Sequence, residues 1–299
     1  MQRLKTIANI FHRAGKYWLD SNAFANAGSL AFFTLFSIAP MLIVIVSIIG
    51  IFYGQEAALG QVSAQLEDLV GANAAETVED AIERSRVGGD GVVATLSGLA
   101  AMLIGATTVF GQMQDSLNAI FGVAPKPSGN GIWLLLRKRL TSLTLILAVG
   151  FVMLVSLSLG VGLRLLVQSV QGWLPYYDVA FSAAESVLSI FLTSCLFAMI
   201  FRALPDVRLS WRDVALGAVL TAIMFTIGRI LIALYLSFTA TASAYGAAGS
   251  LVLLLLWVNY SSLILLFGAA FVRAHMDHRG VTLQPESIAV RVRKEIIED

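Results

Sequence analysis

The sequence predicts an all-α fold: a polytopic membrane helix bundle with six transmembrane helices and an outer amphipathic helical hairpin. The first observation is composition, because 58% of the residues are hydrophobic and 13% are charged, against about half and about a quarter in a soluble domain. The second is a series of apolar windows, each close to the roughly 20 residues that cross a bilayer. The third is that lysine and arginine gather in alternate connections between these windows.

Six windows are the predicted spans, and they cover residues 30–52, 92–111, 141–163, 180–201, 214–236 and 250–272. They form one transmembrane domain, residues 1–272, which is followed by a cytoplasmic tail, residues 273–299. The first 20 residues are polar and basic without an apolar core, so we expect no cleavable signal peptide. The single cysteine, Cys195, lies in an apolar run, which predicts neither a disulfide framework nor a thiol metal site.

The basic residues orient these spans. Sixteen of the 20 lysines and arginines fall in the two termini and in the connections after the second and fourth spans, whereas the outer connections hold only Arg84, Arg86 and Arg164. Positive residues favour the cytoplasmic side of a membrane. Both termini are therefore expected inside the cell.

The first span carries Pro40 near the middle of an uncharged run of 35 residues. A proline removes a backbone donor and crowds the carbonyl four residues earlier. In hydrocarbon that carbonyl needs another hydrogen-bond donor, which is supplied by neighbouring protein, by a hydroxyl such as that of Ser37, or by water in a cavity. Asn22, Asn26 and Ser29 step by four and three residues, which predicts a polar stripe on a helix that leads to this break.

Two loops have patterns of their own. The first outer loop, residues 53–91, combines apolar residues at helical spacing with an acidic face, which predicts a helical hairpin. The hairpin is either a solvated structure packed on the outer membrane surface or a lid over a pore mouth. The first inner loop, residues 112–139, begins as an amphipathic segment and ends, after a breaker run, at Trp133 and three cations, Arg137, Lys138 and Arg139.

These three cations predict an interfacial anchor that binds anionic lipid head groups. A nucleic-acid surface would interleave basic and aromatic residues over a larger soluble face, so we expect no nucleic-acid partner. The oligomeric state stays open, a homo-oligomer included.

Arg229 is the deepest charge in the chain, seven residues from the outer end of its predicted span. Glu185 lies at a matching depth on the preceding span, which predicts an ion pair between consecutive antiparallel helices. The pair either pins the two helices together or holds Arg229 ready for an anionic substrate. Ionisable groups at membrane depth are costly and usually face the bundle interior.

Asn259 lies near the centre of the last predicted span. An asparagine there either hydrogen-bonds a neighbouring helix or contacts a ligand. His275 and His278, with Asp277 between them, follow that span, and two imidazoles alone favour a solvated tail over a metal site. The sequence contains no grouping typical of a catalytic site, a metal site or a cofactor site, so we expect no enzyme and no cofactor.

The assembled residues resemble the YihY/BrkB family of bacterial inner-membrane proteins, once labelled ribonuclease BN, over about residues 18–272. The resemblance rests on these residues in this order: Asp20-x-Asn22, Ala27-Gly28-x-Leu30-Ala31-Phe32, Ser37-x-x-Pro40, Leu117-Asn118-x-Ile120-Phe121-x-Val123, Pro205, Arg208, Trp211-Arg212-Asp213, Gly217-Ala218, Gly228-Arg229, Tyr235, Tyr245-Gly246-x-x-Gly249, Trp257 and Gly268-Ala269. The chain departs from the family at Ala270, where an acidic residue is common. The resemblance implies six spans, cytoplasmic termini and an inner-membrane location, without an agreed substrate.

We therefore expect a transporter or exporter of an anionic or amphiphilic solute or lipid. Its candidate substrate-pathway residues are Arg229, Glu185, Asn259, Ser37, Pro40, Asn22 and Asn26. The alternative is a structural or envelope-assembly membrane protein that transports nothing. A membrane-tethered ribonuclease is disfavoured, because RNA cleavage needs an acid–base pair or a metal-activated water on an accessible surface.

Overall fold

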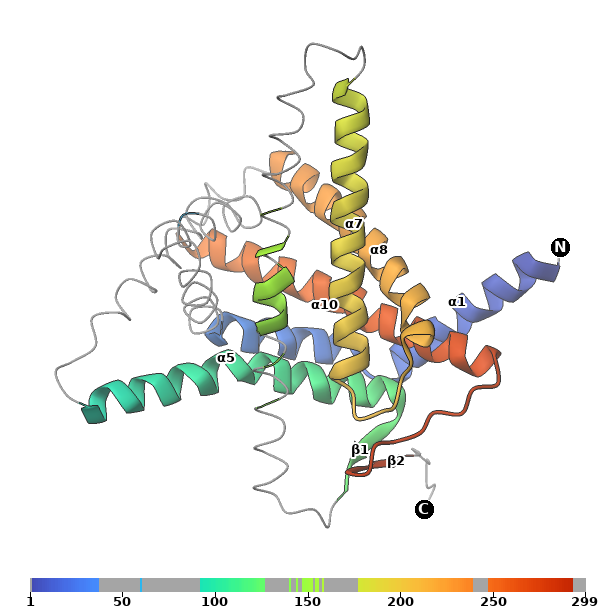
Figure 1. Ribbon diagram of the computed structural model, residues 1–299, viewed down its shortest axis with the longest axis horizontal. Coiled ribbons are helices and arrows are strands. Elements are labelled where there is room, and N and C mark those ends of the chain that lie inside the picture. The colour runs from blue at the N-terminus through green and yellow to red at the C-terminus, as the bar shows by residue number, and fades with distance from the viewer. Residues whose placement is uncertain are drawn as a thin grey trace.

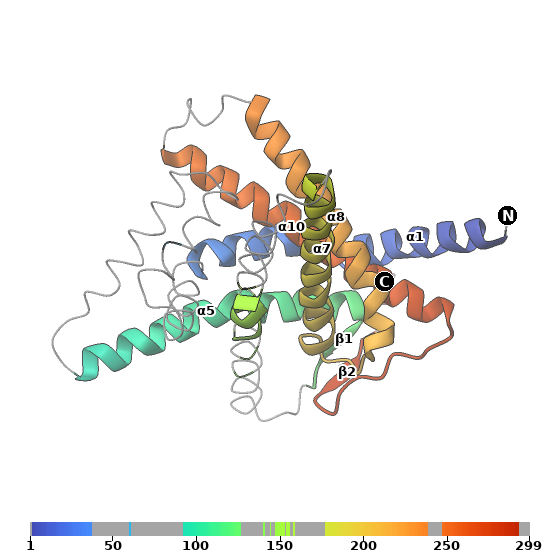
Figure 2. The same ribbon diagram turned by 45° about the horizontal axis from the view of Figure 1, so that its top comes forward.

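The computed structural model describes residues 2–37, 60, 92–126, 140, 144, 147–152, 154, 155, 158, 177–238 and 247–292. Its described part is mostly helical (Figure 1). The chain begins with α1 (Gln2–Asp20), which an apolar helix, Ala23–Ser37, follows after a two-residue turn. In Figures 1 and 2 the N-terminal end of α1 projects beyond the other helices.

Asn22 forms the turn between these two helices. Its φ is 55°, a left-handed conformation that asparagine tolerates better than most residues. The amide groups of Ser21 and Asn22 donate to the carbonyls of Tyr17 and Leu19 at 3.1 and 3.0 Å, which closes α1. The predicted polar stripe on one helix is thus interrupted, because Asn22 lies in a turn and not on the helix that begins at Ala23.

The next element is α5 (Val92–Phe121), a helix of 30 residues. It contains the second predicted span and continues without a break through the residues that were expected to begin the inner loop. It ends at Gly122, whose φ of 67° suits a residue without a Cβ atom. The strand β1 (Val123–Pro125) follows directly.

Three long helices complete the described bundle: α7 (Tyr177–Ala203), α8 (Trp211–Phe238) and α10 (Ala247–His278). They contain three segments long and apolar enough to cross a membrane, Ser186–Ala203, Trp211–Ile232 and Leu254–His278. These segments fall on the fourth, fifth and sixth predicted spans. The first and third predicted spans lie partly outside the described residues, so the described part does not confirm a bundle of six.

Small residues set the contact between α8 and α10. A Cβ atom on Gly217 would overlap the Val272 side chain, and one on Gly268 would overlap the Thr221 hydroxyl. Small residues such as these allow the backbones of two helices to approach closely. The α8 helix also packs along α7, and α10 packs along α1 and α5.

The connections at one end of the bundle fold together, and we call this the inner end. There β1 pairs antiparallel with β2 (Ala289–Arg291), and Val207 forms a bridge with Pro285. The last helix continues past residue 272 to His278, and residues 279–292 return to the inner end. This part of the expected tail is therefore folded.

Several predictions lie outside the described residues: the break at Pro40, the outer hairpin at 53–91 apart from Gly60, and the cations Arg137, Lys138 and Arg139.

Candidate functional site

Arg229 lies on the side of α8 that faces the other helices. It follows Ala218, Ala222 and Phe225 at helical spacing; the two alanines are buried, and the Phe225 ring contacts Trp257 of α10 at 5.4 Å. Yet Arg229 itself is exposed. The apolar residues Ile227, Ile230, Leu231 and Leu234 are exposed on the remaining faces of the same helix. The guanidinium thus lies on the bundle-facing side of α8, and the described helices do not cover it at that level.

Asn259 lies at the same level as Arg229. The Tyr260 ring of α10 packs against Gly228, whose absent Cβ would lie 2.8 Å from the Tyr260 hydroxyl oxygen. Gly228 and Tyr260 therefore set the register of the two antiparallel helices, and Arg229 and Asn259 are their direct chain neighbours. We call this level, defined by Arg229 and Asn259, the Arg229–Asn259 level.

The helix Ala23–Ser37 also borders this level. The Asn259 side-chain nitrogen lies 4.0 Å from the place of a Cβ on Gly28, in the helix Ala23–Ser37. Further along that helix, Leu35 packs against the pair formed by Leu254 and Trp257. The structure therefore brings two predicted pathway residues, Arg229 and Asn259, to one level beside this helix.

The other predicted pathway residues are placed differently. Ser37 is buried, with 2% of its surface exposed. Asn26 caps the first turn, because its side-chain nitrogen donates to the Ser21 carbonyl at 2.9 Å. The side chain of Glu185 lies outside the described part, so its predicted pairing with Arg229 stays a prediction.

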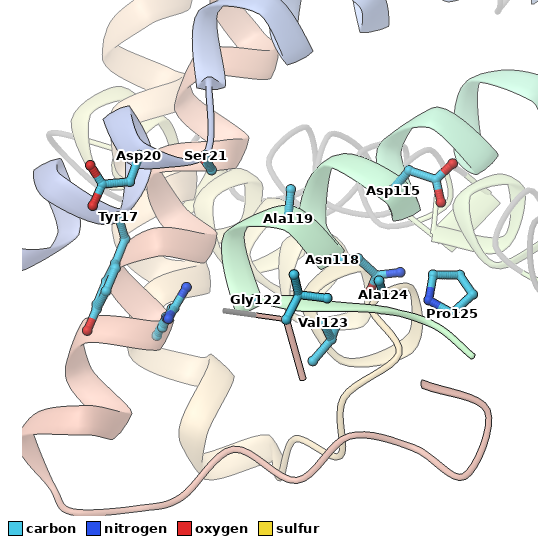
Figure 3. Close-up of a pocket in the computed structure, with 12 residues that line it drawn as sticks. Tyr17, Asp20, Ser21, Asp115, Asn118, Ala119, Gly122, Val123, Ala124 and Pro125 are labelled. Carbon is cyan, nitrogen blue, oxygen red and sulfur yellow. The ribbon is translucent and has the colours of Figure 1, made fainter. Parts of the chain in front are cut away.

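A pocket of about 550 Å³ lies at the inner end (Figure 3). It is lined by residues of α1 and its turn, of the end of α5, of β1, and of α10, with Tyr17, Asp20, Asp115, Asn118 and Arg273 as its larger polar groups. A second pocket of about 530 Å³ shares Gly122, Arg273 and Val292 with the first. Arg273 therefore stands in the wall between two cavities.

The Arg273 guanidinium is fixed by contacts with two other elements. Its Nη1 donates to the Ile120 carbonyl at the end of α5, and its Cζ lies over the Tyr17 ring, 4.1 Å from the ring centroid. Gly122 keeps room for it, since a Cβ there would lie 3.4 Å from Nη1. The buried Nε of Arg273 has no hydrogen-bond partner among the described residues. Arg273 thus links α1, α5 and α10, with donor capacity left over.

Tyr17 extends this link, because its hydroxyl donates to Asp277 Oδ2 at 2.6 Å. Burial of the ring, followed by this bond and the charge of Asp277, raises the pKa of Tyr17 above its ordinary 10.0. The protonated hydroxyl is therefore kept throughout the neutral range. This bond contributes stability below pH 10, and the contribution is lost as the pH rises through the raised pKa.

A buried network joins α5 to the α7–α8 connection. Asp206 is 4% exposed and accepts hydrogen bonds from the side chains of Gln114 at 3.1 Å and Asn118 at 2.8 Å. The Asn118 side-chain oxygen in turn accepts from the Asp206 backbone amide at 2.8 Å. Such reciprocal hydrogen bonding stabilises a buried carboxylate.

The start of α8 is fixed in a similar way. Ser210 precedes the helix, and its backbone amide and hydroxyl both donate to Asp213 Oδ2, at 3.1 and 2.5 Å. Arg279 donates to the other oxygen of Asp213 at 3.1 Å. This cap therefore also ties the returning segment 279–292 to α8.

The sequence predictions did not assign Tyr17, Asp206 or Arg273 to a site. Asn118 appeared only in the family resemblance, and Arg273 only as one of the inner cations. A signal was present in the polar residues Gln114 and Asn118, which lie four apart in an apolar helix and share one face. Within the described residues, no three His, Cys, Asp or Glu side chains gather into a metal site. His275 instead stacks on Phe271, with 6.3 Å between ring centroids.

Comparison with known proteins places the whole chain in one family. Residues 15–291 match the family described as Virulence factor BrkB. A UPF0761 membrane protein of Saccharophagus degradans is 26% identical over 271 residues, which cover 89% of this chain and 59% of the relative. Another, of Psychromonas ingrahamii, is 29% identical over 250 residues, which cover 81% and 79% of the two chains.

A third, UPF0761 membrane protein MS0032 of Mannheimia succiniciproducens, is 24% identical over 255 residues, which cover 85% of this chain and 84% of the relative. The chain thus spans less than two thirds of the Saccharophagus relative and about eight tenths of the other two. No solved structure matches it. The family match over residues 15–291 confirms the resemblance drawn from the sequence: this chain is a membrane protein of the YihY/BrkB family.

Proposed function

We propose that this protein is a transporter or exporter of the bacterial inner membrane, and that it moves an anionic or amphiphilic solute or lipid. One observation carries the proposal: Arg229 is exposed on the bundle-facing side of α8, at the level of Asn259. A guanidinium at membrane depth is costly unless it faces water or a partner. Its planar fork suits carboxylates and phosphates, and polar groups near the membrane midplane recur at transport sites.

The inner end supports access of a substrate from the cytoplasm. The pocket beside Arg273 opens among α1, α5 and β1, where a solute or lipid head group from the cytoplasm would meet the bundle first. The basic residues Arg208, Arg212 and Arg279 belong to the same end, which supports cytoplasmic termini. The proposal includes no catalytic step, no nucleic-acid partner and no cofactor.

The alternative is a structural or assembly protein of the membrane. One observation favours it: α8 and α10 are in close contact at Gly217, Thr221 and Gly268. Such close packing leaves no room for a substrate between the two helices there. In that case Arg229 would serve only to hold neighbouring helices. The two functions differ in what Arg229 does to a moving anion.

A flux measurement in proteoliposomes separates them. Two anionic probes are used: NBD-labelled phosphatidylglycerol, read by dithionite quenching, and entrapped carboxyfluorescein. We expect the wild-type protein to move at least one probe. Arg229→Gln should slow it by about 10–100-fold, because a hydrogen bond to a charged group contributes about 1.5–3 kcal/mol. Arg229→Lys should keep part of the rate.

Arg212→Gln is the matched control, since it removes an exposed arginine from the inner end of the same helix. Movement of both probes at the rate of protein-free vesicles would contradict the proposal, and so would equal rates for Arg229→Gln and wild type. The exchange Arg229→Glu with Glu185→Arg tests the pinning role. If the exchanged protein folds and moves the probe normally, Arg229 does not contact the substrate.

A further inference from the structure

The first helix presents three different stripes of side chains. The packed stripe is Ile10, Ala14 and Tyr17, at steps of four and three residues; the first two are buried and Tyr17 is half-buried. This stripe faces α10, the helix along which α1 lies. The remaining two stripes are largely exposed, although Phe11 of the second also contacts Phe267 and Phe271 of α10.

The second stripe is apolar and exposed. It runs in steps of four through Ile7, Phe11, Gly15 and Leu19, and the three large side chains are 52%, 39% and 59% exposed. Soluble surfaces do carry single exposed apolar residues. A line of such residues along a helix that also carries a basic stripe is typical of a helix that lies in the membrane interface.

The third stripe is polar and basic. It runs through Lys5, Asn9, His12 and Lys16, all exposed, and Arg13 is exposed beside it. The sequence from residue 2 to residue 19 contains no acidic residue, and Asp20 is the first. The stripe is therefore complementary in charge to an anionic surface.

The contacts of α1 place it at the edge of the membrane. Phe11 packs against Phe267 and Phe271, with ring centroids 6.3 and 5.2 Å apart. The Trp18 indole donates to the Leu263 carbonyl at 3.2 Å. Phe267 and Phe271 belong to the inner half of the span Leu254–His278, and Leu263 lies three residues before its middle. The helix α1 therefore lies beside the inner part of that span.

We propose that α1 is an interfacial helix that binds anionic phospholipid of the inner leaflet. Ile7, Phe11 and Leu19 insert among the acyl chains, while Lys5, Lys16 and Arg13 contact the head groups. Each cation near an anionic membrane strengthens the attraction by roughly fivefold, so loss of two should weaken it by roughly 25-fold. This inference is independent of transport, because it concerns only how the N-terminal helix is held.

Spin labels at two neighbouring exposed positions test the orientation. Ile7→Cys and Asn9→Cys are each made in a Cys195→Ser background and labelled in nanodiscs that contain phosphatidylglycerol. We expect the label at 7 to collide mainly with oxygen, which concentrates in lipid, and the label at 9 to collide mainly with a water-soluble nickel chelate. Equal exposure of both labels to nickel would overturn the proposal. A label at 7 shielded from both reagents would also overturn it, because protein would then cover the stripe.

The charge dependence is tested by two double variants that each remove two exposed cations. Lys5→Gln with Lys16→Gln removes them from α1, and Lys126→Gln with Arg208→Gln removes them elsewhere at the inner end. The readout is the oxygen-to-nickel ratio of the label at 7 as the phosphatidylglycerol fraction is raised. The α1 variant should need a much larger phosphatidylglycerol fraction to reach half of the highest ratio, and the control should match the parent. If the α1 variant matches the parent, or if neutral lipid alone gives the full ratio, the proposed anionic binding is wrong.

Discussion

The buried Asp206 network permits a quantitative prediction about stability. The carboxylate accepts two side-chain hydrogen bonds, from Gln114 and Asn118, and each bond to a charged group contributes about 1.5–3 kcal/mol. Asp206→Ala removes both bonds and leaves two amide groups without this acceptor at a buried position. The expected loss in the free energy of unfolding is therefore about 3–6 kcal/mol. Asp206→Asn should lose about half as much, because one amide donor keeps an acceptor.

The assay is unfolding in mixed micelles by added dodecyl sulfate, followed by the fluorescence of the chain's tryptophans. Asp20→Ala is the control, since Asp20 is exposed and an exposed substitution usually changes stability by at most about 0.5 kcal/mol. Asn118→Ala and the double variant with Asp206→Ala complete a cycle. Because both single variants break the side-chain bond between Asn118 and Asp206, their effects should not be additive. An Asp206→Ala protein as stable as the control would refute the reasoning.

Three further predictions use the same assay. Gly268→Ala should lower the free energy of unfolding by about 1–3 kcal/mol, because the added Cβ overlaps the Thr221 hydroxyl. Adding Thr221→Ala should restore part of this stability. If it restores none, another contact limits how closely the helices approach. Asn22→Gly should leave the free energy of unfolding nearly unchanged, and Asn22→Val should lower it by about 1–2 kcal/mol. The reason is that φ at this position is 55°, a region that β-branched residues avoid. Equal stabilities of the two variants would contradict the left-handed turn. Arg273→Gln should lower the free energy of unfolding by about 2–4 kcal/mol, because it removes the bond to the Ile120 carbonyl and the contact with the Tyr17 ring. Arg273→Lys should recover only part of this stability, because an ammonium has no planar face. Full recovery would mean that the positive charge alone stabilises this contact.

The parts of the fold that depend on local pattern were predictable. Long apolar runs predicted the spans that lie in α7, α8 and α10, because a membrane-crossing helix must hide every backbone polar group along its length. The small residues Gly217 and Thr221 lie four apart, a spacing typical of close helix packing, and they contact α10 at Val272 and Gly268. The family assignment also followed from residue order along the chain and is confirmed.

The parts that depend on distant contacts were not predictable. Asn118 and Asp206 are 88 positions apart, and the local sequence around either residue does not indicate its contact with the other. The three-residue strands β1 and β2 are too short to show an alternating pattern, and each forms only because the other lies beside it. Arg273 resembled one more inner cation of a tail, although the continuation of α10 and the ring of Tyr17 make it part of the folded inner end.

The candidate site was predictable in its residue types and less so in its surroundings. Arg229 and Asn259 were chosen because polar groups are costly at membrane depth, and the structure brings them to one level through the contact of Gly228 with Tyr260. The inner pocket was missed because its lining comes from three helices and a strand. Each of those residues alone has an ordinary place at a membrane surface.

The central claim, that the Arg229–Asn259 level belongs to a transport path, is tested most directly by cysteine labelling from each side of the membrane. Single cysteines at Asn259, Thr226 and Ser37 in a Cys195→Ser background are treated with a membrane-impermeant thiol reagent applied inside or outside. Leu256→Cys, on the exposed apolar side of α10, is the lipid-facing control. Transport predicts that the Asn259 cysteine reacts from both sides, in alternating conformations, far faster than the control. If none of the three cysteines reacts faster than the control from either side, the result would contradict transport. The protein would then be a packed structural bundle.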